Sequence, residues 1–143
     1  MKKNNQNTNA FLIHISAFAG FVFPFGQIIT PLIAWQTLKD RSTFLDEQGK
    51  EAINFNLSYT LYAFILSIAF IPLFFRSFFS SFNNFNNFQL NLDLSTSNLF
   101  NIMGLGSILG ILYLVGISLI LIAAFKAKEG ENYTYPFTIK FIK

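Results

Sequence analysis

Three long stretches without a charged residue divide the chain, and polar segments separate them. The stretches cover residues 10–38, 52–75 and 94–125. A helix needs about 20 apolar residues to cross a bilayer, so each stretch is long enough to enter one. The pattern predicts an all-α integral membrane protein with a single helical membrane domain, residues 1–143, that begins with a disordered polar tail over residues 1–10.

The first apolar stretch contains three residues that disfavour a helix, namely Pro24, Gly26 and Pro31. Proline removes a backbone donor, and glycine is the poorest helix former after proline. We therefore predict that residues 11–38 form two half-helices joined at this break. At about 1.5 Å per residue neither half crosses a hydrocarbon core of about 30 Å, so the pair would form a re-entrant hairpin. The alternative is one kinked span.

The distribution of basic residues favours the re-entrant hairpin. Lysine and arginine collect on the cytoplasmic flanks of membrane helices. If the first stretch returns, nine of the ten basic residues lie on one side of the membrane, and only Arg76 lies on the other. If it spans, the split is seven to three. We predict an integral protein of the cytoplasmic (inner) membrane with both termini in the cytoplasm.

The remaining segments predict two long transmembrane helices and a tail. One helix covers residues 44–75, including an amphipathic foot at its start, and the other covers residues 101–127. Between them, residues 76–100 are rich in Phe and Asn and predict an outer loop. Residues 128–143 alternate apolar and polar side chains, which is typical of an extended segment, and their Tyr and Lys residues suit the cytoplasmic interface. Within the last helix, Gly106-x-x-x-Gly110 is either a helix-packing face or a chance match.

The second long helix begins with charged residues that continue as a polar stripe. Thr43 to Asp46 resembles a capping box, and Asp46 and Lys50 have the spacing of a helical ion pair. The stripe recurs every three or four residues, fades at Tyr62, and consists of Glu47, Lys50, Glu51, Asn54 and Ser58.

Two interpretations of the stripe remain open. In the structural one, its residues cap the helix and hold it against its neighbours. In the functional one, Glu51 and Asn54 face the broken backbone at Pro24–Gly26 or line a hydrated pocket, because polar groups at membrane depth are costly. His14, the single histidine, is likewise either a packed, hydrogen-bonded side chain or a proton-responsive group.

Composition narrows the chemistry. The chain is 52% hydrophobic and 12% charged, against about 25% charged residues in an ordinary soluble domain. With no cysteine and one histidine, it has no thiol nucleophile and few metal-binding side chains, so we predict no metal, no cofactor and no catalytic residues. A Phe-rich loop with a single arginine does not suit a phosphate backbone, so we predict no nucleic-acid partner.

Three segments, in this order, resemble a family of small bacterial membrane proteins of unknown function: PFGQIITPLIAW, FLDEQGKEAINFNLSYTLY and GENYTYPFTIKFIK. That family is considered distantly related to the Tic component of the chloroplast inner-envelope translocon, and MamF-type magnetosome proteins are similar. The resemblance covers the chain from about Phe11 onward and implies a compact helical membrane domain without known catalytic residues. It singles out Pro24, Gly26, Pro31, Trp35, Asp46, Glu47, Gly49, Lys50, Glu51, Asn54, Phe55, Tyr135, Pro136 and Ile139.

Two classes of function follow from these patterns. We predict a non-enzymatic scaffold, assembly factor or protein-translocation factor whose partners are the lipid bilayer and other membrane proteins or further copies of itself. The alternative is an oligomeric channel or small-solute transporter that uses the polar stripe, since broken helices often surround binding sites. An enzyme has the least support, because no spacing of His14 with a serine such as Ser118 favours catalysis.

Overall fold

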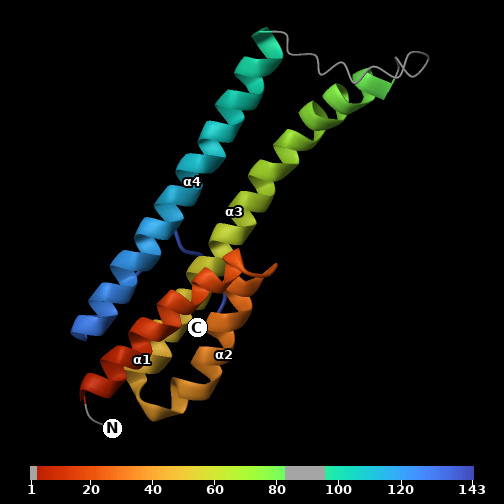
Figure 1. Cartoon of the computed structure of the whole chain (residues 1–143). Helices are drawn as coiled ribbons and strands as arrows, with labels where there is room; N and C mark the ends of the chain where they lie inside the picture. Colours follow the sequence, from red (N-terminus) through yellow and green to blue (C-terminus); the bar gives the residue numbers. More distant parts are fainter. Residues whose placement is uncertain (1–2, 83–95) are drawn as a thin grey trace. The chain divides into compact units, whose positions relative to one another are not determined.

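The computed structural model describes residues 3–82 and 96–143, and within them every regular element is a helix and no strand occurs. This confirms the predicted all-α class. Residues 83–95 of the predicted Phe/Asn loop lie outside this description. The elements are α1 (Lys3–Ile15), the 3₁₀-helix η1 (Ser16–Phe21), α2 (Gly26–Leu38), the 3₁₀-helix η2 (Lys39–Arg41), α3 (Thr43–Phe82) and α4 (Thr96–Glu129), shown in Figure 1.

The chain divides into two compact units. One comprises Met1–Thr60 and Val115–Lys143, and the other comprises Leu61–Leu114. We call the first unit the foot. It contains α1, α2, the first part of α3, the last part of α4 and a C-terminal tail, which we define as residues 131–143. All the features discussed below as a site lie in the foot.

The first two helices form a hairpin rather than one kinked helix, as the break at Pro24 and Gly26 predicts. The turn places Phe25 in the left-handed region at φ 61°, and α2 starts at Gly26. A side chain at residue 26 would collide with the backbone carbonyl of Ala19, so only glycine lets η1 and α2 approach this closely. Pro31 does not break the helix. It lies inside α2 with its ring buried, which corrects the prediction for that residue.

Residues 3–10, for which we predicted a disordered tail, form the first turns of α1. Packing against the end of α4 explains the difference. Ala10 is fully buried in a cluster that includes Ala127. The side chain of Asn7 lies against Gly130, which ends α4 with φ +84°. Tertiary contacts thus hold a segment whose polar composition alone does not favour a helix.

Two clusters of buried side chains hold the foot together, and both rely on alanine. One joins α1, α3 and α4 through Ala10, Ile13, Leu45, Ala52 and Ala127. The other adds the tail and consists of Ala17, Phe55, Ile120, Ala123 and Tyr135. Because alanine side chains are small, the helix backbones can approach closely.

Two glycines mark the closest approaches of α3 to its neighbours. A Cβ on Gly49 would collide with the Trp35 side chain of α2, and a Cβ on Gly116 would lie 2.7 Å from the Tyr59 ring. By contrast, Gly106 and Gly110 have no described atom within 4 Å of the corresponding position. The GxxxG pattern therefore does not mark a packing face among the described residues.

The start of α3 and the end of α4 differ in character. Ser42 caps α3, because its Oγ accepts a hydrogen bond from the Leu45 amide, 3.3 Å away. The cap therefore lies one residue before the predicted capping box.

In α4, the segment Gly106–Glu129 is long and apolar enough to cross a membrane. It is the one such helix found among the described residues, so the predicted span within α3 stays a prediction.

Candidate functional site

Asn54 of the polar stripe binds the C-terminal tail. Its Oδ1 accepts hydrogen bonds from the backbone amides of Phe141 (3.0 Å) and Ile142 (2.8 Å). Its Nδ2 donates to the carbonyl oxygen of Ile142 at 2.9 Å. Asn54 is 1% exposed, so its amide depends on the tail rather than on water for hydrogen-bond partners. One amide side chain thereby satisfies three groups of the tail backbone.

Three further stripe residues bind the tail, two through its backbone and one through a side chain. Ser58 Oγ accepts from the amide of Ile139 at 2.8 Å and donates to the Asn54 carbonyl at 2.7 Å. Glu51 accepts from the amide of Tyr135 and faces the Lys140 ammonium, both at 3.4 Å. Glu47 accepts from the side chain of Asn132 at 3.0 Å.

The hypothesis that Glu51 and Asn54 face the Pro24–Gly26 break is therefore wrong. The residue after the break, Gln27, lies instead beside Thr60, with its Nε2 3.5 Å from the threonine Oγ1. The reason is that an extended tail has free backbone donors and acceptors, whereas those of a helix are already paired. The stripe supplies side chains that match them.

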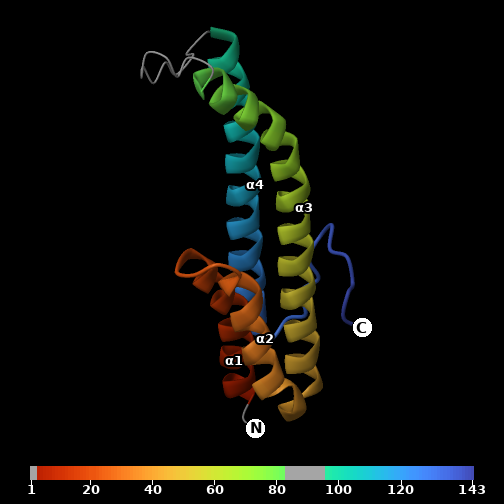
Figure 2. The same ribbon diagram turned by 90° about the vertical axis from the view of Figure 1, so that its right-hand side faces the viewer.

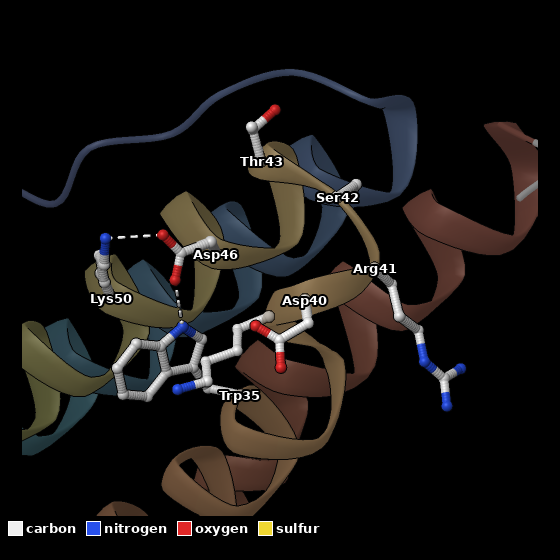
Figure 3. Close-up of a pocket in the computed structure, with 8 residues that line it drawn as sticks. Trp35, Asp40, Arg41, Ser42, Thr43, Asp46 and Lys50 are labelled. Atoms are coloured by element: carbon white, nitrogen blue, oxygen red, sulfur yellow. Dashed lines mark hydrogen bonds and ion pairs between the residues drawn. The ribbon is translucent and has the colours of Figure 1, made fainter.

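Lys50 points to a different surface from the rest of the stripe. Its ammonium lies 2.6 Å from Asp46 Oδ2, which confirms the predicted ion pair. The indole of Trp35 donates to Asp46 Oδ1 at 2.9 Å, so Asp46 bridges α2 and its own helix (Figure 3). The Lys39 ammonium lies 5.4 Å from the centre of the Trp35 ring.

These groups line an open pocket of about 600 Å³ at the turn between α2 and α3. Its lining is Trp35, Lys39, Asp40, Arg41, Ser42, Thr43, Asp46 and Lys50. The hydrogen bond from Lys50 lowers the pKa of Asp46, so this ion pair persists below the pH at which an ordinary aspartate is protonated. Arg41 extends away from Trp35 and toward solvent (Figure 3).

His14 is the centre of a buried hydrogen-bonded chain. Its Nδ1 lies 2.9 Å from the Tyr135 hydroxyl, and its Nε2 lies 2.9 Å from Gln48 Oε1. Gln48 Nε2 in turn lies 3.4 Å from Asn132 Oδ1, and Asn132 donates to Glu47. This series of hydrogen bonds therefore connects the exposed carboxylate of Glu47 to the buried phenol of Tyr135.

The carboxylate fixes the direction of every bond in this chain. Glu47 only accepts, so Asn132 and then Gln48 must donate through their NH₂ groups. His14 therefore donates from Nε2 and accepts from Tyr135 at Nδ1, which defines a neutral imidazole with both nitrogens satisfied. His14 lies on α1, outside the candidate span, and is fully buried. Burial lowers its pKa from 6.5 to about 4.

We expect the foot to lose stability as the pH falls below about 6.5. The unfolded chain then protonates His14, whereas the folded foot does not until about pH 4. Protonation of His14 therefore does not affect the free energy of unfolding above pH 6.5, the unfolded pKa. By about pH 5 it lowers the free energy of unfolding by about 2 kcal/mol. Thermal unfolding in detergent over this range tests the expectation, with His14→Phe as the control that removes the titration. An equal pH dependence in wild type and His14→Phe would contradict it.

Sequence reasoning missed Gln48 and Asn132. The available signal was that Gln48, Ala52 and Phe55 share one helical face, and a lone amide on an apolar face requires a partner. Nothing in the sequence indicates that Asn132 is that partner. Among the residues that the structure describes, no three His, Asp or Glu side chains gather where they could hold a metal ion.

A helical foot that binds its own tail, together with a helix able to cross a bilayer, defines a small membrane-associated helical protein. The chain belongs to the magnetosome magnetite crystal formation protein family (MamF and MmsF), whose model matches residues 5–142. This confirms the resemblance to MamF-type proteins, whereas the relation to the chloroplast Tic component stays a prediction. No curated protein and no solved structure matches the chain.

Proposed function

We propose that this protein is a non-catalytic membrane scaffold that acts in the formation of magnetite crystals in a magnetosome membrane. The family match supports the biological setting. The observation that carries the scaffold role is the occupied stripe. Glu47, Glu51, Asn54 and Ser58 each bind the tail. The polar groups of the stripe are therefore occupied within the foot, and its outer surface is what partners would contact.

The occupied stripe also distinguishes the scaffold from the channel alternative. A channel would need polar side chains of the stripe to exchange partners with a passing solute. Here the tail backbone takes the donors and acceptors of Asn54 and Ser58, and both side chains are 1% exposed. A solute would have to displace the tail first. No observation in the foot favours a channel over a scaffold.

We further propose that α3 and α4 both cross the membrane and that the start of α3 and the end of α4, Thr43 and Glu129, lie on its cytoplasmic side. The distribution of basic residues supports this orientation. The turn between α2 and α3 would then point into the cytoplasm, with its exposed charges Asp40 and Arg41 available to partner proteins or further copies of the chain.

Purification from native membranes in mild detergent tests the scaffold proposal. We expect wild-type protein to elute as a complex larger than the monomer, and Arg41→Glu to lose the partner while keeping its fold. Glu129→Lys is the matched control, since it reverses an exposed charge at the end of α4. A wild-type protein that is monomeric and without partners would contradict the proposal. Ion flux in liposomes that Asn54→Leu abolishes would support a channel instead.

A further inference from the structure

The tail rises along α3 and then returns. Tyr135 is bound at Glu51, Ile139 at Ser58, and Ile142 at Asn54. Since an α-helix rises about 1.5 Å per residue, the tail climbs about 10 Å before it turns back. A turn at Pro136-Phe137, which we call the apex of the tail, lies between the first two contacts and two residues before Ile139. The tail is therefore a loop that runs along α3 from the level of Glu51 to that of Ser58 and back to that of Asn54.

Side chains of α3 satisfy four backbone amides of this loop. The amides of Tyr135, Ile139, Phe141 and Ile142 donate to Glu51, Ser58, Asn54 and again Asn54. A segment in water does not need such partners, because water supplies them. At membrane depth, however, irregular backbone is tolerated only where protein groups satisfy it. The stripe therefore supplies these four amides with the hydrogen-bond partners that lipid cannot provide.

The apex of the loop carries an exposed aromatic ring on strained backbone. Phe137 is 89% exposed and has φ 57°. Among the described residues, one other non-glycine residue has a positive φ: Phe25, at the tip of the hairpin and 63% exposed. Each follows a proline. Glycine would remove the strain at either position, so a bulky exposed phenylalanine is a costly choice in water and a favourable one in hydrocarbon.

We propose that residues 133–143 form a second re-entrant loop in the cytoplasmic leaflet, with Phe137 inserted into the hydrocarbon at a depth similar to that of Phe25. The tail and the α1–α2 hairpin lie on different sides of α3 (Figure 2). The two apices lie near similar levels of α3, because the hairpin tip is next to Thr60 and the apex of the tail comes two residues before Ile139, which contacts Ser58.

The occupant is lipid because the exposed apolar surface surrounds the foot. Exposed side chains lie on the hairpin tip, on α2, on α4 and on the tail, and they include Val22, Ile33, Ile122 and Phe137. A partner protein would cover one side, whereas acyl chains cover all of them. Lys140 on the returning limb is compatible with this position, because its long stem lets the ammonium reach Glu51 and the interface. The proposal requires that the foot is associated with a membrane, and it does not depend on the scaffold role.

Spin labels at single cysteines test the proposal, since the chain has no native cysteine. The labelled positions are Phe137→Cys and Pro136→Cys on the tail apex, Phe25→Cys on the hairpin tip, and Asp40→Cys as the aqueous control. The full-length protein is reconstituted in liposomes of zwitterionic and anionic phospholipid. Collision of each label with oxygen, which partitions into lipid, is compared with collision with a water-soluble nickel chelate.

We expect the oxygen-to-nickel ratio at residues 136, 137 and 25 to exceed that at residue 40 several-fold, with similar values for 137 and 25. Slow hydrogen exchange at the Phe141 and Ile142 amides shows that the label has left the tail bound. With the tail bound, a ratio at both apex positions equal to that at residue 40 would place the loop in water and overturn the proposal. Labels shielded from both reagents would show a protein cover and overturn it as well.

Discussion

Gly49→Ala is expected to destabilise the foot by about 3 kcal/mol, because it forces α2 and α3 apart. The new methyl group would collide with Cγ, Cδ1 and Cβ of Trp35. These atoms lie at the base of the side chain, so no small rotation of the ring relieves the clash. The displaced indole would also lose its hydrogen bond to Asp46.

Thermal unfolding in detergent, followed by the fluorescence of Trp35, measures this effect, because Trp35 is the single tryptophan of the chain. Gly110→Ala is the matched control. It makes the same substitution within a helix but meets no described atom within 4 Å. The higher helix propensity of alanine should leave this variant at least as stable as wild type. If both variants unfold at the wild-type temperature, the close contact of Gly49 with Trp35 does not exist.

Asn54→Ala is expected to release the C-terminal tail. The substitution removes three hydrogen bonds to the tail backbone, each worth about 1 kcal/mol. A loss of about 3 kcal/mol corresponds to a roughly 100-fold larger population of detached tail. The bond that follows Lys140 offers a direct measurement, because trypsin can cleave it only when Phe141 leaves Asn54. We expect the rate of cleavage there to rise in proportion.

Asn56→Ala is the control for the tail experiment. Asn56 is nearly as buried as Asn54, at 2% exposed, but its side chain donates to the Ala52 carbonyl of its own helix. Both substitutions remove a buried amide from α3, and only one removes contacts with the tail. Equal cleavage at Lys140 in the two variants would show that the stripe does not hold the tail. Faster cleavage in Asn54→Ala alone supports the assignment of the stripe.

The two experiments together separate the packing of the foot from the function of its tail. Gly49→Ala disrupts the contact between α2 and α3, whereas Asn54→Ala leaves the contact residues Trp35 and Gly49 untouched. A scaffold whose partner binds near Arg41 should therefore keep that partner in Asn54→Ala and lose it in Gly49→Ala. The reverse result would place the partner surface on the tail.

The sequence predicted the break in the hairpin because its cause is local. Pro24 removes a backbone donor and Gly26 permits a close approach of backbone, whatever surrounds them. Pro31 has the same local preference but lies inside α2 with its ring buried, so packing outweighs a single lost hydrogen bond. The start of α1 shows the same effect, since contacts with α4 make residues 3–10 helical.

The polar stripe was predictable as a set of positions but not as a binding site. The spacing of Glu51, Asn54 and Ser58 places them on one helical face, because an α-helix has 3.6 residues per turn. The same spacing placed Lys50 with them, although its side chain turns to Asp46 and the Trp35 pocket. A helical repeat resolves which residues are neighbours, and it does not resolve to which side of a wide stripe each side chain points.

By itself, the sequence determined the helical class, the hairpin break, the ion pair of Asp46 with Lys50 and the resemblance to MamF-type proteins. These depend on backbone preferences, short spacings and the order of motifs. Only the tertiary structure decided that the stripe binds the tail and that His14 is joined to Gln48 and Tyr135. Those contacts connect residues up to 121 positions apart. Their formation depends on how several helices pack together, which no local pattern encodes.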